Sequence, residues 1–348
     1  MKIVATILSL LVIATVGNAM DLQEEFDPIG PPIHTFTTST GKILFYIDQG
    51  QPDWKPVVLV GGAGTSVRVF GLTEFARTLR TQLKLRVISV ERNGFGETPY
   101  LNDWDYENYA TEVEELLNYL GIDLFRGIAI SGGGPYLATI AARMPERLAS
   151  LHFAAALSFS SPESWNCALD WDSVAQILRP LVTDPIAWWD LGPDTSIHAV
   201  PGFQDLANDD GARTFFIRGQ FNEDDTLPIE TPMVHEFKLF CNEPPNVNHV
   251  TAPVYLYYGT ADTSVPPVPH MEYWKTHFPN IAKERLYEGE GHDIQYRHWD
   301  QILIDMAGMG GKTIICHNGK TKLLPEHVAH RFLERGAGLG ICAWQQSE

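Results

Sequence analysis

Short apolar runs alternate along this chain with longer amphipathic stretches. Four runs have the length of strands and are almost wholly apolar: 57–60, 85–90, 125–130 and 149–158. The stretch 105–122 instead has apolar residues at helical spacing, namely Tyr109, Val113, Leu116, Leu117 and Leu120. A polar and apolar alternation around the Ser-Thr-Gly turn near residue 40 predicts two further strands before the first run.

Strands that are apolar on both faces and alternate with helices are typical of a parallel sheet covered on both sides. We therefore predict an α/β fold. The alternation stops over 158–250, which is rich in tryptophan and proline, and resumes from 251 to 307. We interpret 20–157 and 251–307 as one core and 158–250 as an inserted, mainly helical cap. Residues 308–348 form a separate C-terminal segment.

The composition limits the classes of partner. The 348 residues include 25 Lys and Arg against 43 Asp and Glu, a formal net charge of −18. Such an acidic chain is a poor partner for nucleic acid or for an anionic membrane surface. The expected partner is a small molecule, with no stable membrane insertion.

The first residues have the pattern of a secretory signal. Lys2 precedes an apolar stretch over 3–16, and the small residues Gly17 and Ala19 fit cleavage after Ala19. Residues 1–19 are therefore interpreted as a signal peptide, which predicts a secreted or periplasmic protein. An N-terminal membrane anchor is the alternative.

Ser131 follows the apolar run 125–130 and precedes a helical stretch. A nucleophilic serine on a sharp strand-to-helix turn needs small neighbours two residues away on either side. Ala129 and Gly133 occupy these positions, and alanine is still small. An ordinary serine in a turn remains the alternative at this point.

A serine nucleophile needs a base, and the base needs a carboxylate to orient it. His292 and Asp262 each lie just past an apolar strand. The order Ser131, Asp262, His292 is the order used on α/β-hydrolase sheets. We therefore predict a catalytic triad from these three residues. The other histidines considered as the base, and set aside because of their positions, are His249, His270 and His298.

The glycine-rich stretch 61–66 follows the strand 57–60. We assign the backbone N–H groups of Ala63 and Gly132 to an oxyanion hole. A phosphate-binding role is discounted, because the stretch lacks both the Gly-Lys-Ser/Thr ending of a P-loop and the dinucleotide spacing. No cofactor is expected. The cysteines have no close Cys-x-x-Cys spacing, so no metal site is expected.

With these motifs the chain resembles the α/β-hydrolase superfamily, in its capped serine-hydrolase form, over about residues 33 to 307. The resemblance rests on "LVGGAGTS", "VERNGFGETP", "AISGGGPYLA", "YYGTADTSVP" and "EGEGHD". Gly61 stands where the family has histidine, Glu91 where it has aspartate, and Thr98 where it has serine. The resemblance implies an α/β-hydrolase fold and acyl transfer.

Residues 316–342 resemble a short C-terminal module of some exported bacterial proteins, which opens with Cys-His-x-Gly-Lys-Thr and closes with Leu-Gly-x-Cys. Such modules often carry two more histidines, where this chain has Phe332 and Arg335. The resemblance therefore favours a disulfide between Cys316 and Cys342 over metal binding. Cys167 and Cys241 both lie in the predicted cap and are expected to pair with each other.

Three functions fit these features. The first is an esterase-type serine hydrolase acting on an acyl bond. The second is an exopeptidase of the proline-iminopeptidase type, which needs cap carboxylates to hold a substrate amine. The candidates for that role are Glu223, Asp224, Asp225, Glu230 and Glu236. The third is a non-catalytic binding protein on a hydrolase scaffold, and the presence of all three triad candidates argues against it.

Overall fold

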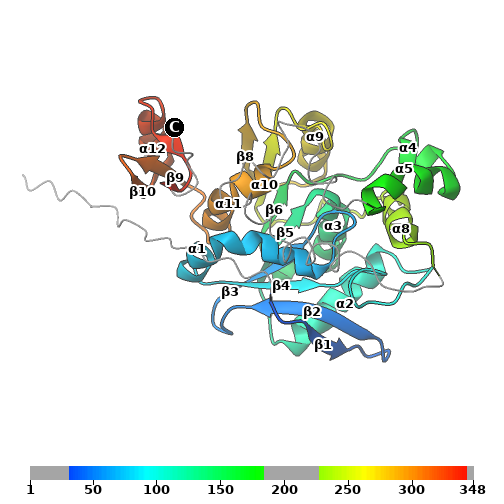
Figure 1. Cartoon of the computed structure of the whole chain (residues 1–348). Coiled ribbons are helices and arrows are strands. Elements are labelled where there is room, and N and C mark those ends of the chain that lie inside the picture. The colour runs from blue at the N-terminus through cyan, green and yellow to red at the C-terminus, as the bar shows by residue number, and fades with distance from the viewer. Residues whose placement is uncertain (1–30, 184–226, 343–348) are drawn as a thin grey trace, which may run out of the picture.

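The computed structural model describes residues 31–183 and 227–342 (Figure 1). An eight-stranded sheet has the strand order β1-β2-β4-β3-β5-β6-β7-β8. Its strands are β1 (His34–Thr37), β2 (Ile43–Gln49), β3 (Lys55–Val60), β4 (Leu85–Val90), β5 (Phe125–Ile130), β6 (Leu148–Ala154), β7 (Val254–Gly259) and β8 (Ile281–Tyr287). The first two pairings are antiparallel, and the pairings from β4 to β8 are parallel.

Helices cover both faces of this sheet. One face packs against α2 (Tyr106–Tyr119), α3 (Gly134–Arg143) and α9 (Pro267–His277). The other packs against η1 (Val67–Ala76), α1 (Arg77–Gln82), α10 (Ile294–Arg297) and α11 (Trp299–Met306). A one-turn 3₁₀ helix, η3 (Pro145–Arg147), leads into β6. The predicted mostly parallel sheet between two helical layers is confirmed.

The central strands are apolar because both of their faces are covered. All six residues of β4 are buried, whereas residues of the edge strand β8 alternate between partly buried and exposed. The parallel strands end at one edge of the sheet, which is where side chains from separate loops can meet.

Two helical segments of the core are interrupted. Residues 67–82 form the 3₁₀ helix η1 followed by α1, and η1 contains Gly71 and the β-branched Val67 and Val69, which favour the α-helix poorly. Residues 294–306 are divided into α10 and α11 at His298. The His298 ring stacks on Tyr287 and its Nε2 lies 2.7 Å from Glu290 Oε2, so it is held toward β8 and its loop.

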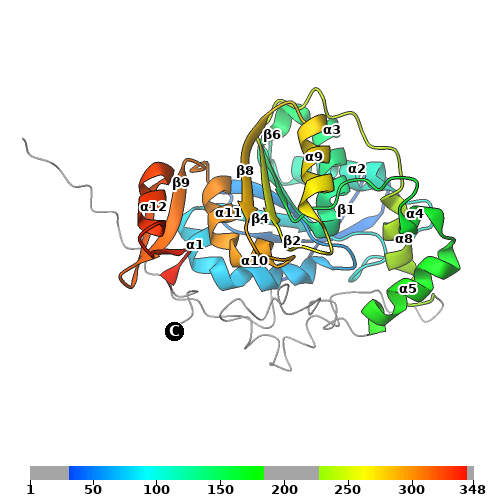
Figure 2. The same ribbon diagram turned by 90° about the horizontal axis from the view of Figure 1, so that it is seen from above.

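We use "cap segment" for residues 158–183 and 227–250. It contains α4 (Trp165–Ala168), α5 (Trp171–Thr183) and α8 (Thr231–Leu239). A disulfide joins Cys167 and Cys241, which supports the expected pairing and links α4 to the end of α8. Figures 1 and 2 show these helices at one side of the molecule.

We use "C-terminal module" for residues 312–342. Its strands β9 (Lys312–His317), β10 (Lys320–Pro325) and β11 (Gly338–Leu339) form a three-stranded sheet with the order β10-β9-β11, beside α12 (Glu326–Leu333). Cys316 and Cys342 form the second disulfide, again the expected pair. Both views place this module on the side opposite the cap segment (Figures 1 and 2).

Candidate active site

Ser131 lies directly after β5, where the chain turns into η2 (Ser131–Gly133) and then α3. Its φ of 48° is in the left-handed region, which is rare for a residue other than glycine. A residue held in such a conformation at a strand-to-helix turn is a typical nucleophile position. The geometry of the turn therefore agrees with the role predicted for Ser131.

Glycines make this turn sterically possible. A Cβ on Gly133 would lie 2.5 Å from the Val60 carbonyl oxygen, and one on Gly134 would lie 2.0 Å from that of Leu157. Ala129 is fully buried in the core that faces α2 and α3, so the fold accommodates its methyl group inside a central strand.

His292 lies in the loop between β8 and α10, and its Nε2 is 3.1 Å from Ser131 Oγ. Its Nδ1 is 2.8 Å from Asp262 Oδ2. With Nδ1 protonated and donating to the carboxylate, Nε2 presents a lone pair to the serine hydroxyl. This arrangement can remove the hydroxyl proton when Ser131 attacks an electrophile.

Asp262 follows β7 and its side chain is fully buried. The backbone N–H groups of Ser264 and Val265 donate to its Oδ1, at 2.9 and 2.8 Å. These two bonds fix the carboxylate and leave Oδ2 for His292. The structure therefore brings together the three residues selected from the sequence, each from the end of a different strand.

The other candidate histidines have different partners. His249 Nε2 lies 3.1 Å from the Ala142 carbonyl, and His298 pairs with Glu290. His270 lies on α9, where its Nδ1 accepts from the Ser158 N–H at 3.0 Å. Burial lowers the pKa of His270 to about 4, with Asp262 raising it and His292 lowering it by smaller amounts.

Ala63 and Gly132 are adjacent in space. A Cβ on Gly132 would lie 2.7 Å from the Ala63 nitrogen, so no other residue fits at position 132 without moving the loop. The two backbone segments thus meet beside Ser131, as an oxyanion hole requires. Whether their N–H groups serve as that hole stays a prediction.

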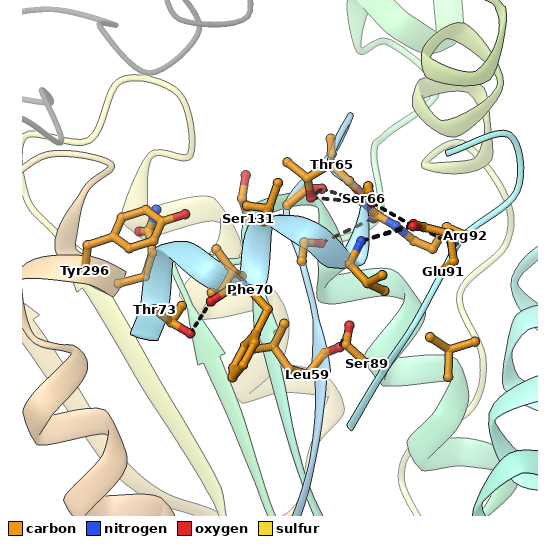
Figure 3. Close-up of a pocket in the computed structure, with 18 of the residues that line it drawn as sticks. Leu59, Thr65, Ser66, Phe70, Thr73, Ser89, Glu91, Arg92, Ser131 and Tyr296 are labelled. Atoms are coloured by element: carbon orange, nitrogen blue, oxygen red, sulfur yellow. Dashed lines mark hydrogen bonds between the residues drawn. The ribbon is translucent and has the colours of Figure 1, made fainter. Parts of the chain in front are cut away.

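A cavity opens at Ser131 and His292 and extends beneath η1. Figure 3 shows Ser131 at its upper side, Thr65, Ser66, Glu91 and Arg92 toward one end, and Tyr296 toward the other. Much of its wall is apolar: Leu59, Val67, Val69, Phe70, Ile130 and Tyr296. Such a wall suits an apolar group next to the reacting atoms.

Sequence reasoning missed a polar group behind this cavity. Glu91 Oε2 accepts from Ser66 Oγ at 2.7 Å, and Glu91 Oε1 accepts from the Val67 N–H at 3.1 Å. Burial raises the pKa of Glu91 to about 7, while the bonds to Ser66 and Val67 and the charge of Arg92 lower it by smaller amounts. The charged pair Glu91 and Arg92 comes directly after β4, whose residues are all buried, and this placement is the signal in the sequence that indicates such a group.

Two of the carboxylates considered for holding a substrate amine are already paired. Glu236 forms a buried ion pair with Arg92 at 2.6 Å. Glu230 lies 2.5 Å from Arg179, whose side chain is exposed. Glu223, Asp224 and Asp225 lie outside the described residues. Within 31–183 and 227–342, no group of three or more His, Cys, Asp or Glu side chains is placed to hold a metal ion.

No protein-family model and no curated protein sequence matches the chain. Solved structures do match it. An α/β-hydrolase fold protein from Chitinophaga pinensis has a TM-score of 0.60 at 15% identity, with 81% of this chain and 98% of that one covered. A thermophilic esterase from Thermogutta terrifontis has a TM-score of 0.56 at 18% identity, over 80% and 97%.

A bromoperoxidase from Bacillus anthracis has a TM-score of 0.58 at 20% identity, covering 80% of this chain and 100% of that one. At these identities the likeness concerns the fold. The chain has the α/β-hydrolase fold, as predicted, and several of its structural neighbours are esterases. None of the described helices is both long enough and apolar enough to cross a bilayer.

Proposed function

We propose that this protein is an exported serine hydrolase that cleaves an ester-type acyl bond through an acyl-enzyme on Ser131. The observation that carries the proposal is the chain of contacts from Ser131 Oγ to His292 and from His292 to Asp262, at 3.1 and 2.8 Å. It begins at a serine with a strained backbone, which a merely structural serine has no need of.

In the first half-reaction Ser131 Oγ attacks the carbonyl carbon while His292 takes its proton. Asp262 stabilises the imidazolium that forms, and the N–H groups of Ala63 and Gly132 stabilise the oxyanion. The tetrahedral intermediate collapses when His292 returns the proton to the leaving alcohol. Water, deprotonated by His292, then attacks the carbonyl carbon of the acyl-enzyme. The bond from that carbon to Ser131 Oγ breaks as His292 returns the proton to Ser131, and the acid is released.

The apolar wall beneath η1 supports a substrate with an apolar group on its acyl or alcohol side. An exopeptidase has less support, because Glu230 and Glu236 are engaged by Arg179 and Arg92 rather than free for an amine. Export is supported by the signal-like residues 1–19 and by the two disulfides, which fit an oxidising compartment.

A panel of ester, thioester and amide substrates tests the proposal. We expect the highest kcat/KM on esters, and a loss of roughly 10⁴-fold or more in Ser131→Ala. Ser161→Ala is the matched control, because Ser161 is exposed on the cap segment, and it should keep the parent rate. Faster amide turnover would favour the exopeptidase, and full activity in Ser131→Ala would exclude the acyl-enzyme.

A further inference from the structure

Arg92 donates hydrogen bonds to backbone carbonyl groups of the loop Gly61–Thr65. The residue follows β4 and is 2% exposed. Its Nη2 donates to the carbonyls of Gly62 and Thr65, at 2.5 and 2.8 Å, and its Nη1 donates to that of Gly61 at 3.3 Å. Figure 3 shows Arg92 beside Thr65 on the flank of the cavity that contains Ser131.

Glu236 holds the same loop from the cap segment. It lies on α8 and is 1% exposed. Its Oε2 accepts from the Gly64 N–H at 2.7 Å, while its Oε1 lies 2.6 Å from Arg92 Nη1. Met233, also on α8, lies against Gly64, where a Cβ would come 3.0 Å from the Met233 Cε. The loop is thus fixed between β4 and α8.

These contacts determine the direction of the Ala63 N–H. In a trans peptide the carbonyl and the N–H point to opposite sides. The Gly62 carbonyl points at Arg92, so the N–H of the same peptide unit, which belongs to Ala63, points away from Arg92. Gly132 is close to the Ala63 nitrogen, since a Cβ on Gly132 would lie 2.7 Å from it. No acceptor within the described residues takes this N–H.

We propose that Arg92 and Glu236 are positioning residues that aim the Ala63 N–H at the developing oxyanion. Through Glu236, the cap segment thereby helps to position the oxyanion hole that stabilises the transition state. This inference rests on the proposed function. It assigns Glu236 to the loop rather than to a substrate amine.

The burial of the pair gives a way to test it. Replacing a buried ion pair by apolar side chains of similar volume is often neutral or stabilising, whereas removing one partner leaves a buried charge unpaired. The double variant Arg92→Met/Glu236→Leu therefore leaves neither charge of the pair unpaired and loses the contacts to the loop. We expect it to fold with a lower Tm, because loop carbonyls and the Gly64 N–H lose their partners. Glu236→Gln is the second variant, because its amide oxygen can still accept from the Gly64 N–H.

The measurements are kcat and KM on a soluble short-chain aryl ester, the rate of Ser131 phosphonylation by an aryl phosphonate, and Tm. We expect the folded double variant to lose roughly 10- to 100-fold in kcat and in phosphonylation rate, with KM changed less than about threefold. Glu236→Gln should show a smaller loss of the same kind. Lys238→Gln is the control on the same helix; Lys238 donates to the Leu169 carbonyl inside the cap segment and should be neutral.

A folded double variant with parental kcat, or one in which only KM rises, would overturn the inference. So would a kcat loss in Lys238→Gln equal to that in Glu236→Gln, because the effect would then be a general one of the cap segment. If the unmodified protein neither hydrolyses the ester nor reacts with the phosphonate, the proposed function itself fails.

Discussion

The cap segment and the C-terminal module are both additions to the sheet, and each contains one disulfide, yet they contact the core in different ways. The cap segment sends the charged side chain of Glu236 into the loop beside Ser131. The module instead places Ile314 and Ile341 in the apolar core with α11, on the opposite side of the molecule (Figure 2). The cap segment thus contributes a buried charged side chain to the loop beside Ser131, while the module extends the apolar core.

The module also donates hydrogen bonds from backbone N–H groups to two side chains of α11. The Ile314 N–H donates to Gln301 Oε1 at 3.1 Å, and the Ile341 N–H donates to Asp300 Oδ2 at 2.9 Å. Neither contact reaches the loop Gly61–Thr65 or the triad candidates. Changes in the module should therefore alter stability, and changes in the cap segment should alter turnover.

Removing the two disulfides should give the largest difference between the cap segment and the module. The half-cystines are 74 residues apart in the cap segment and 26 apart in the module. By loop-closure entropy their loss costs about 4.5 and about 3.5 kcal/mol of unfolding free energy. Replacing Cys167 and Cys241 by Ser should also lower kcat roughly tenfold, whereas the same change at Cys316 and Cys342 should leave kcat unchanged. Denaturant unfolding and ester kinetics on both variants measure this, and equal kcat values would contradict the comparison.

The second largest effect is expected at Asp300, which should make the stability of the protein depend on pH. Burial raises the pKa of this carboxyl to about 6, against lesser lowering by His298 and by the N–H groups of Gln301 and Ile341. Because the folded protein holds the proton more tightly, the free energy of unfolding should fall as pH rises from about 4 to about 6, by about 3 kcal/mol.

Asp300→Asn should make this slope shallower, while kcat of the folded protein stays unchanged. The slope that remains is expected from Glu91, because burial also raises its pKa, to about 7. Unfolding curves at pH 4, 5, 6 and 7 measure it. Asp53→Asn, at an exposed position, is the control and should keep the parental slope. An unchanged slope in Asp300→Asn would show that another group is responsible.

The smallest effect is expected at the module's surface ion pairs. Glu326 lies 2.5 Å from Lys283 and 3.7 Å from Arg285, but its side chain is 46% exposed. Exposed pairs contribute at most about 1 kcal/mol. Glu326→Gln should lower Tm by a few degrees at most, with no change in kcat. A large loss would mean that the module is held by charge rather than by apolar contact.

The local pattern of apolar residues was enough to predict the sheet and to select three residues at the ends of its strands. Apolar runs identify buried strands, and the ends of parallel strands meet at one edge, so Ser131, Asp262 and His292 could be selected without coordinates. Both disulfide pairs were also expected. The 3₁₀ form of η1 was not, because apolar spacing alone does not distinguish a 3₁₀ helix from an α-helix over so short a stretch.

The contacts between distant segments could not be predicted. Arg92 and Glu236 are 144 positions apart, and their pairing depends on how α8 lies over the loop Gly61–Thr65. Glu236 is one of five acidic residues between 223 and 236, and nothing in the sequence distinguishes it from exposed ones. Its burial is what distinguishes it. The packing of Ile341 into the core could not be predicted for the same reason, because it depends on how the whole module folds.

Covalent labelling of Ser131 is the most direct test of its proposed role as the nucleophile. The protein is treated with a fluorophosphonate, and the mass of the intact chain and of the peptide containing Ser131 is measured. We expect one label, on Ser131, which is absent in Ser131→Ala and forms much more slowly in His292→Ala and Asp262→Asn. A folded protein that takes no label, or that is labelled equally in Ser131→Ala, would contradict it.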